Sequence, residues 1–263
     1  MSSFVFRFTH AITRKPSRSI ANGLRAEDCG NPDPNLFMEH HEEYVRALTT
    51  AGAQVITLDP LEEFPDSVFV EDTALCLPEG AIVMRPGAPS RLGEAAAIKP
   101  TLLSQFSTVM EIENGFIEGG DILVTGEEIL VGTSDRTNEE GIAELAGLVK
   151  QWGYKVRRVQ TPPEVLHFKT DCGLLDAKTI LATERLASSG CFNDYKVILT
   201  AKGEEAAANA VRFNDVVLLP AGFSQTASRL KQEGYTVVEL PNSEAAKVDG
   251  GMSCLSLRYC ATL

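Results

Sequence analysis

The segment DILVTGEEILV, residues 121–131, shows the unit from which the rest of the chain is built. Two apolar triplets flank a turn containing Gly126, which predicts a β-hairpin. Thr137 and Glu140 then form a capping-box pattern, and apolar residues recur at helical spacing until Gly153. The predicted order is two strands, a helix and a third strand, over residues 122–124, 129–131, 137–152 and 154–159.

The same order of elements recurs along the whole chain. Similar units begin near Asp72, near His167 with a short helix around 183–189, and near Ala210. A fifth unit would join the two ends of the chain, with the strand 254–259 preceding a strand at 4–8, a helix at 37–51 and a strand at 54–58. Repeats that cannot bury their own apolar faces must stack, and pairing of the ends predicts a closed ring.

Five residues occupy the corresponding position at the start of each hairpin, between 42 and 49 residues apart: Asp72, Glu118, His167, Asn209 and Cys254. In a ring of equivalent units, such positions converge on the axis. The sequence therefore predicts that two carboxylates, a histidine and a cysteine meet in one central pocket. We expect an α/β fold of five pseudo-symmetric ββαβ units, in a single domain spanning residues 1–263, since no linker or low-complexity tract divides the chain.

Composition narrows the class of protein. The formal net charge of −12 argues against a nucleic-acid surface, which needs clustered Lys and Arg, although it suits cationic substrates and solubility equally well. No run of about 18 apolar residues is present, and the N-terminus lacks the apolar stretch of a signal peptide. The six cysteines show neither C-x-x-C nor metal-site spacing, which indicates reduced thiols in the cytoplasm.

Three residues form a candidate catalytic set. Taken alone, Cys254 is typical of a buried core thiol and His167 of a hydrogen-bonded structural histidine. Glu118, within Glu118-Gly119-Gly120-Asp121, is a carboxylate that needs a cationic partner if it is buried. Together they fit the logic of a thiolate nucleophile, a proton-shuttling imidazole and an orienting carboxylate.

Acidic and basic residues near these positions suit a guanidinium-bearing amino acid. On an extended strand Asp66 and Asp72 would share one face and Glu71 the other, and two acids on one face suit a planar cation with several N–H donors. A polar strand end is the alternative. Arg91 and Arg136 follow hairpins in neighbouring units, which favours paired recognition of an α-carboxylate, although an exposed helix start is the commoner role of arginine.

Cofactor motifs are absent from the sequence. His40 and His41 lie among glutamates, but adjacent histidines face different sides of a helix and no H-E-x-x-H motif is present. No phosphate-binding glycine loop occurs either. We therefore expect neither a metal nor a cofactor.

Six motifs, in this order and spacing, resemble the dimethylarginine dimethylaminohydrolases over almost the whole chain: residues 64–72, 85–88, 118–121, 136–138, 166–170 and 249–258. The resemblance implies a pentein, a five-bladed α/β propeller. It also implies hydrolysis of asymmetric dimethylarginine or monomethylarginine to citrulline and dimethylamine or methylamine, through a covalent thiouronium intermediate on the cysteine.

The resemblance also implies residue roles. Cys254 resembles the nucleophile, His167 the general acid and base, and Glu118 its carboxylate partner. The positions that resemble substrate ligands are Asp72, Asp66 and Glu71 for the guanidinium, Arg91 and Arg136 for the amino-acid end, Leu24 in a lid loop, and Phe69 and Val248.

Other activities remain open at this point. An arginine deiminase would use the same residues on unmethylated arginine. Members of that family, however, have longer chains with an extra helical insertion, for which this sequence has no room. An amidinotransferase would keep the cysteine and histidine, and a non-catalytic binding protein of this fold would lack the Cys-His-Glu set. The sequence leaves open the oligomeric state, for which a homodimer is one alternative, and the preference between mono- and dimethylated substrates.

Overall fold

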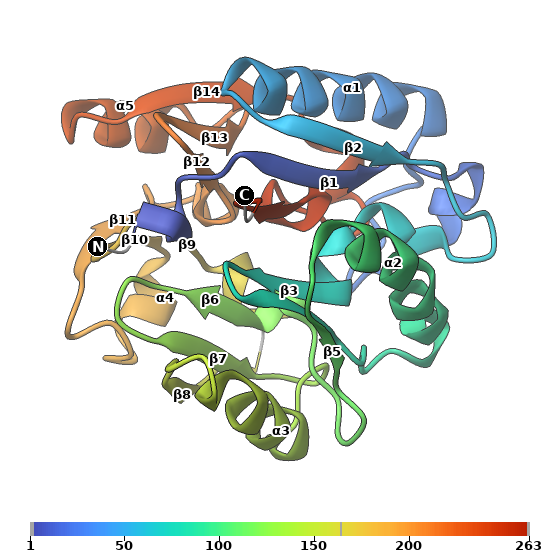
Figure 1. The fold of residues 1–263 in the computed structure, drawn as a ribbon. Coiled ribbons are helices and arrows are strands. Elements are labelled where there is room, and N and C mark those ends of the chain that lie inside the picture. Colours follow the sequence, from blue (N-terminus) through green and yellow to red (C-terminus); the bar gives the residue numbers. More distant parts are fainter. Residues whose placement is uncertain (1–2, 164, 262–263) are drawn as a thin grey trace.

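The computed structural model describes residues 3–163 and 165–261, and its named strands form five three-stranded sheets (Figure 1). In each sheet the first strand pairs antiparallel with the middle strand, and the middle strand pairs parallel with the last. A parallel pair needs a crossover connection, and a helix supplies it in every unit. The strand, strand, helix, strand unit predicted from the sequence is therefore confirmed.

The elements of the five units correspond one to one. The first strands are β3 (Ala74–Leu77), β6 (Ile122–Val124), β9 (Cys172–Asp176), β12 (Val211–Phe213) and β15 (Leu257–Tyr259). The middle strands are β4 (Gly80–Val83), β7 (Ile129–Thr133), β10 (Thr179–Ala182), β13 (Val216–Pro220) and β1 (His10–Arg14). The last strands are β5 (Val109–Glu111), β8 (Val156–Gln160), β11 (Lys196–Leu199), β14 (Thr236–Leu240) and β2 (Gln54–Leu58). The crossover helices are α2 (Leu92–Gln105), α3 (Glu139–Lys150), α4 (Glu184–Ala187), α5 (Ser224–Gln232) and α1 (Pro34–Thr50).

The two ends of the chain close the ring. Strand β15 pairs antiparallel with β1, with Tyr259 opposite His10 and Leu257 opposite Ile12. The first strands face one another around the axis, where β3 contacts β15 and β9 contacts both β6 and β12. The five-bladed α/β propeller expected from the sequence is thereby confirmed.

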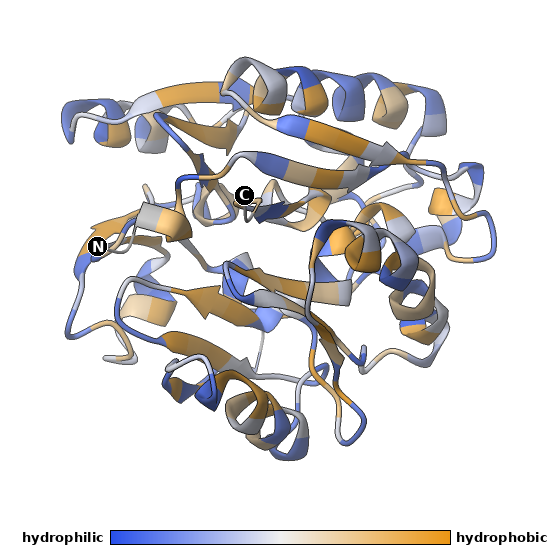
Figure 2. Cartoon of the chain, viewed as in Figure 1, coloured by the Kyte–Doolittle hydropathy of each residue, from blue (hydrophilic) through white to orange (hydrophobic). Residues whose placement is uncertain are grey.

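Apolar residues concentrate on the strands and on the inward faces of the helices (Figure 2). In one cluster, Leu145 and Val149 of α3 pack with Ile82 of β4 and Ile129 of β7, so each helix also helps to join neighbouring blades. Among the described residues, no helix combines the length and the apolar character needed to cross a bilayer.

Five short 3-10 turns precede the first strands and set the positions of the candidate site residues. They are η4 (Val70–Thr73), η6 (Gly119–Asp121), η7 (Phe168–Thr170), η8 (Glu205–Ala208) and η9 (Ser253–Leu255). Asp72 and Cys254 lie within such turns, Glu118 and His167 directly precede one, and Asn209 directly follows one. The remaining short helices are η1 (Ser3–Val5), η2 (Arg18–Asn22), η3 (Pro65–Val68), η5 (Pro89–Arg91) and α6 (Ser243–Ala246).

The strand predicted at residues 4–8 is wrong, because the middle strand of that blade is β1, which begins at His10. The alternating phenylalanines of the N-terminal segment have another cause. Phe4 meets Tyr154 edge-on with ring centroids 6.2 Å apart, and Phe8 packs on Phe213 at 5.4 Å. The two-residue spacing of these phenylalanines therefore reflects their packing against residues of other blades.

The extended conformation predicted between Asp66 and Asp72 is also wrong, since this segment forms the 3-10 turns η3 and η4. A 3-10 helix has three residues per turn, so a spacing of six can still place two residues on one side. Likewise, the cap of α3 is not the predicted Thr137. The side chain of Asn138 accepts from the Gly141 N–H, whereas the Thr137 hydroxyl accepts from the Glu118 N–H at 3.1 Å.

Candidate active site

Cys254 is a buried thiol, with 8 % of its surface exposed, in the turn η9. Two donors point at its sulfur: the backbone N–H of Gly251 at 3.4 Å and Nδ2 of Asn209 at 3.7 Å. Burial, together with the negative charges of Glu71 and Asp72, raises the pKa of Cys254 to about 12. The sulfur is therefore a thiol at neutral pH until a positive charge arrives, and the two donors are placed to stabilise a thiolate.

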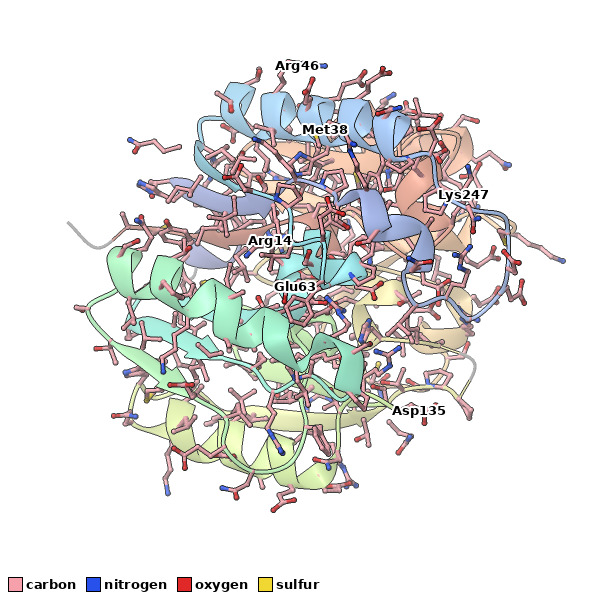
Figure 3. All side chains as sticks on the ribbon, turned by 90° about the vertical axis from the view of Figure 1, so that its right-hand side faces the viewer. Arg14, Met38, Arg46, Glu63, Asp135 and Lys247 are labelled. Carbon is pink, nitrogen blue, oxygen red and sulfur yellow. The ribbon has the colours of Figure 1, made fainter. Side chains whose placement is uncertain are left out.

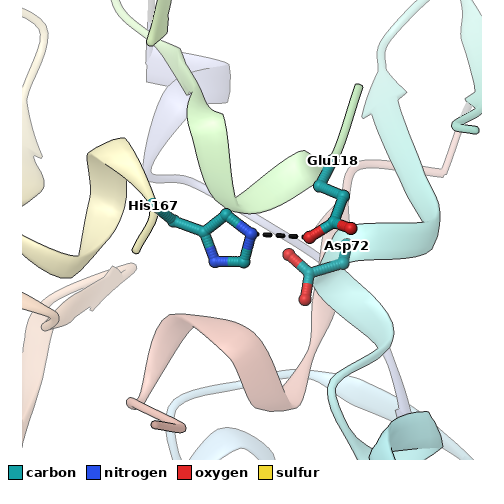
Figure 4. A group of neighbouring side chains, drawn as sticks. All are labelled: Asp72, Glu118 and His167. Atoms are coloured by element: carbon teal, nitrogen blue, oxygen red, sulfur yellow. Dashed lines mark hydrogen bonds and ion pairs between the residues drawn. The ribbon is translucent and has the colours of Figure 1, made fainter. Parts of the chain in front are cut away.

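His167 and Glu118 form a buried pair, in which Nε2 of the histidine donates to Oε2 of the glutamate at 2.6 Å (Figure 4). Burial alone would raise the pKa of Glu118, but the hydrogen bond and the charge of His167 lower it to about 2. Burial would likewise lower the pKa of His167, yet the charge of Asp72 and the bond to Glu118 raise it to about 9. At neutral pH the pair is an imidazolium with a carboxylate.

Asp72 completes this cluster. A carboxylate oxygen of Asp72, a carboxylate oxygen of Glu118 and a ring nitrogen of His167 all lie within 4.8 Å of one another (Figure 4). Asp72 Oδ1 accepts from the Gly120 N–H at 2.9 Å. A Cβ at Gly120 would lie 2.7 Å from that oxygen and 2.8 Å from His167 Cγ. Only glycine therefore fits at this position between Asp72 and His167. Two carboxylates at this spot suit a cation rich in N–H donors.

Arg91 lies inside the site, against the carboxylates expected to receive a substrate cation. Its Nη1 is 2.5 Å from Asp72 Oδ2, and its Nη2 is 2.7 Å from Glu94 Oε2. Nη2 also donates to the backbone oxygens of Asp66 and Phe69. In this arrangement the Arg91 guanidinium binds two carboxylates of the protein, those of Asp72 and Glu94. Arg136 is more open, with Nη1 3.6 Å from Glu118 Oε1 and 18 % of its side chain exposed.

The loop that follows η2 covers the site through Asp66. The Leu24 N–H donates to Asp66 Oδ1 at 3.0 Å, and Leu24 itself is exposed. A Cβ at Gly23 would lie 3.0 Å from the same oxygen and 3.2 Å from Val248, so Val248 adjoins the loop. Burial raises the pKa of Asp66 despite the charge of Arg91.

Phe69 forms part of the floor beneath the loop that carries Cys254. It is buried, and a Cβ at Gly250 would lie 2.3 Å from its ring. Its ring also packs against Phe37 of α1, with centroids 6.4 Å apart.

Glu71 has partners of its own. Its Oε1 is 2.6 Å from both Lys169 Nζ and Arg258 Nη2, and its Oε2 accepts from the Ser253 hydroxyl at 2.7 Å. The Glu71 carboxylate therefore binds two cations and a hydroxyl group of the protein, and these cations already offset its charge.

Asn209 was absent from the set of site residues taken from the sequence, although it shares the ring position of Asp72, Glu118, His167 and Cys254. Its Oδ1 accepts from the Ser253 N–H at 2.8 Å, while its Nδ2 donates to the Cys254 sulfur. A Cβ at Gly251 would lie 2.2 Å from its side chain. The repeat phase was the signal that could have identified it.

A cavity of about 1110 Å³ opens beside the candidate catalytic residues, next to Leu166 and Asn209. Its wall includes Asn209 and Gly251 next to the nucleophile, Ala26 of the covering loop, and Asp135 after β7. Figure 3 shows Asp135 and Lys247, which follows α6, on one side of the molecule. A small organic molecule therefore has space next to Asn209 and Gly251, whose amide groups contact the Cys254 sulfur.

The chain matches a family model and several relatives. The model described as N,N dimethylarginine dimethylhydrolase, eukaryotic, matches residues 31–170. An N(G),N(G)-dimethylarginine dimethylaminohydrolase of Pseudomonas aeruginosa is 39% identical over 254 residues, which cover 96% of this chain and 100% of the relative. One from Streptomyces coelicolor is 31% identical, over 94% of this chain and 96% of the relative.

Solved structures give the same result. The P. aeruginosa enzyme, as a cysteine-to-serine mutant complexed with citrulline, superposes with a TM-score of 0.94 and 39% identity over 97% of this chain and 100% of that one. The N-terminal domain of the cyanobacterial arginine dihydrolase ArgZ, 21% identical with a TM-score of 0.84 over 96% of each chain, shares the fold. The chain belongs to the dimethylarginine dimethylaminohydrolase family.

Proposed function

We propose that the protein hydrolyses asymmetric dimethylarginine and monomethylarginine to citrulline and dimethylamine or methylamine. The observation that carries this proposal is the convergence of the His167–Glu118 pair with Asp72 and the buried Cys254 on one axis. A nucleophile, a proton donor and a carboxylate for the guanidinium are the groups this reaction needs. The family relatives support the choice of substrate.

In the first step the substrate guanidinium binds to Asp72 and Asp66. Its positive charge offsets the negative charges that raise the pKa of Cys254, so the thiol loses its proton to solvent. The thiolate attacks the guanidinium carbon, and the Gly251 N–H and the Asn209 amide lie at the sulfur as it reacts. A tetrahedral centre results.

In the second step the imidazolium of His167 donates its proton to the methylated nitrogen, and the C–N bond breaks to release the amine. A thiouronium remains on Cys254. Neutral His167 then takes a proton from water, whose oxygen attacks the same carbon, and collapse of this centre breaks the C–S bond. The products are the ureido group of citrulline and the regenerated cysteine, with Glu118 stabilising the imidazolium throughout.

The remaining site residues receive supporting roles in this proposal. Arg136 and Arg91 hold the substrate α-carboxylate, with Arg91 exchanging Asp72 for the substrate. Leu24 closes over the substrate, while Phe69 and Val248 line the apolar part of its path. We further propose that residues 1–263 act as one catalytic domain in the cytoplasm, in line with six free cysteines.

The decisive measurement is citrulline formation from dimethylarginine, monomethylarginine and arginine at equal concentrations. We expect turnover of both methylated substrates. Clear turnover of arginine with none of dimethylarginine would instead assign an arginine deiminase. Cys254→Ser should abolish turnover, and Cys191→Ser, a change at a half-buried thiol outside the site, should leave it intact.

A further inference from the structure

The carboxylate of Glu71 is the centre of a buried ionic cluster beneath the catalytic groups. We call the Glu71 cluster the set of Glu71, Lys169, Ser253 and Arg258, joined by the three contacts to Glu71 already described. Glu71 is 3 % exposed and Lys169 9 % exposed, so neither charge is screened by bulk solvent. Although burial would raise the pKa of Glu71, the charges of Lys169 and Arg258 lower it.

Three members of the cluster lie within two residues of a reacting group in the sequence. Glu71 lies in η4 directly before Asp72, Lys169 lies in η7 two residues after His167, and Ser253 lies in η9 directly before Cys254. One carboxylate therefore connects three turns that belong to three different blades.

Arg258 strengthens the connection from β15, where its Nη1 donates to the backbone oxygens of Ser253 at 2.9 Å and Ser256 at 2.7 Å. The side chain of Ser256 in turn bonds the buried Tyr44 hydroxyl at 2.7 Å. The turn that contains Cys254 is thus fixed by several hydrogen bonds from Glu71 and Arg258. Short 3-10 turns have poor internal hydrogen-bond geometry, so such tertiary contacts fix their position.

We propose that Glu71 is a positioning residue, which ties the turns of Asp72, His167 and Cys254 together through Lys169, Ser253 and Arg258 and does not bind the substrate itself. This inference rests on the proposed function for the identity of the three reacting groups. It replaces the role of guanidinium ligand that the sequence suggested for Glu71. The charges of the cluster also act on the nucleophile: Glu71 raises the pKa of Cys254, and Lys169 lowers it.

Glu71→Gln is the central test, because it keeps the shape of the side chain and removes its charge. We expect kcat to fall about 10- to 100-fold, the loss that follows from small misplacement of reacting groups, with KM changed far less. The pKa of Cys254, read from the pH dependence of its alkylation by iodoacetamide, should fall because Lys169 and Arg258 remain. A thiol that is easier to ionise in a slower enzyme is the signature of lost positioning.

The matched control is Glu128→Gln, which removes a carboxylate that binds Arg157 Nη2 at 2.7 Å, away from the reacting groups. It should lower the midpoint of thermal unfolding but leave kcat and the pKa of Cys254 unchanged. This variant separates general loss of an ion pair from loss of the Glu71 cluster.

Lys169 provides a second pair of variants if Glu71→Gln does not fold. Lys169→Met should raise the pKa of Cys254 and lower kcat, whereas Lys169→Arg keeps the charge and should restore both toward the native values. A cavity of about 120 Å³ beside Lys169 and Arg258 leaves room for the larger guanidinium.

Two results would overturn the inference. The first is a rise in KM of Glu71→Gln at least as large as its fall in kcat, which would make Glu71 a substrate ligand. The second is an unchanged kcat and an unchanged alkylation profile in both Glu71→Gln and Lys169→Met. Alkylation needs no substrate. If the native protein fails to turn over dimethylarginine, the proposed function falls, while a shifted alkylation profile still supports the cluster and an unshifted one rejects it.

Discussion

At the scale of single residues, His167 and Glu118 form an ion pair inside the protein. Each group is buried, and burial opposes the charged form of both, yet mutual attraction at 2.6 Å keeps both charged. Since the raised pKa of His167 exists only in the folded protein, it links stability to pH.

We predict that folding stability decreases as the pH rises from about 6.5 to about 9. His167 has a pKa of about 9 in the folded protein against its ordinary value of 6.5, so its contribution is complete below pH 6.5 and is lost as the pH rises through 9. The contribution is on the order of 3 kcal/mol. Urea unfolding of the native protein and of His167→Gln across this range measures it as the difference between the two pH profiles. Parallel profiles would contradict the raised pKa.

At this scale the sequence identified the reacting residues better than their surroundings. Cys254, His167 and Glu118 could be selected because they share one repeat phase. The partners of Glu71 could not, because its ion pairs depend on which side chains from the turns of other blades face it, and the contact of Arg91 with Asp72 depends on how two turns of one blade pack. For Asn209 the sequence shows the position in the repeat, but it does not show the hydrogen bond to the Cys254 sulfur.

At the scale of elements, the turns that precede the first strands position the chemistry. Their glycines matter where two side chains meet over bare backbone, as at Gly120 of η6. The neighbours of Gly120 are Asp72, which accepts from the Gly120 N–H, and His167, which bonds to Glu118.

We predict that Gly120→Ala lowers kcat about 100-fold, because the new methyl group would lie 2.8 Å from His167 Cγ and must displace it. Gly147→Ala is the matched control. No atom lies within 4 Å of a Cβ at this exposed position of α3, and alanine should stabilise the helix by about 1 kcal/mol. Steady-state kinetics and thermal unfolding of both variants are the measurements. Full activity of Gly120→Ala would show that the pair tolerates displacement.

Some element boundaries differ from those predicted by the spacing of apolar and acidic residues. The strand predicted at 4–8 and the extended segment at 66–72 were wrong because apolar or acidic residues at even spacing also arise in packed coil and in 3-10 turns. The sequence predicts Thr137 as the cap of α3 because the pattern does not reveal that its hydroxyl accepts from the Glu118 N–H at the start of the same blade.

At the scale of the molecule, closure of the ring depends on β15. Its Tyr259 is buried and packs between Phe106, with ring centroids 4.7 Å apart, and His10 at 5.3 Å. These contacts join the blade that contains both ends of the chain to the blade that contains α2.

We predict that Tyr259→Ala destabilises the protein by about 3–5 kcal/mol, the usual cost of removing a buried aromatic side chain. Tyr154→Ala, at a half-buried ring whose contact with Phe4 is at 6.2 Å, should cost clearly less. Denaturant unfolding compares the two variants. Equal losses would mean that the closing blade contributes no more than the periphery.

The sequence by itself determined the repeating unit, the number of blades and the axis on which Asp72, Glu118, His167 and Cys254 meet, because periodicity and spacing are local properties that every repeat restates. Only the tertiary structure decided what those residues touch: the Arg91 guanidinium against Asp72, the Glu71 cluster beneath the nucleophile and the amide of Asn209 at its sulfur. The Glu71 cluster and the Asn209 contact join turns from different blades, and their geometry is set by packing of the whole ring, which no single stretch of sequence encodes.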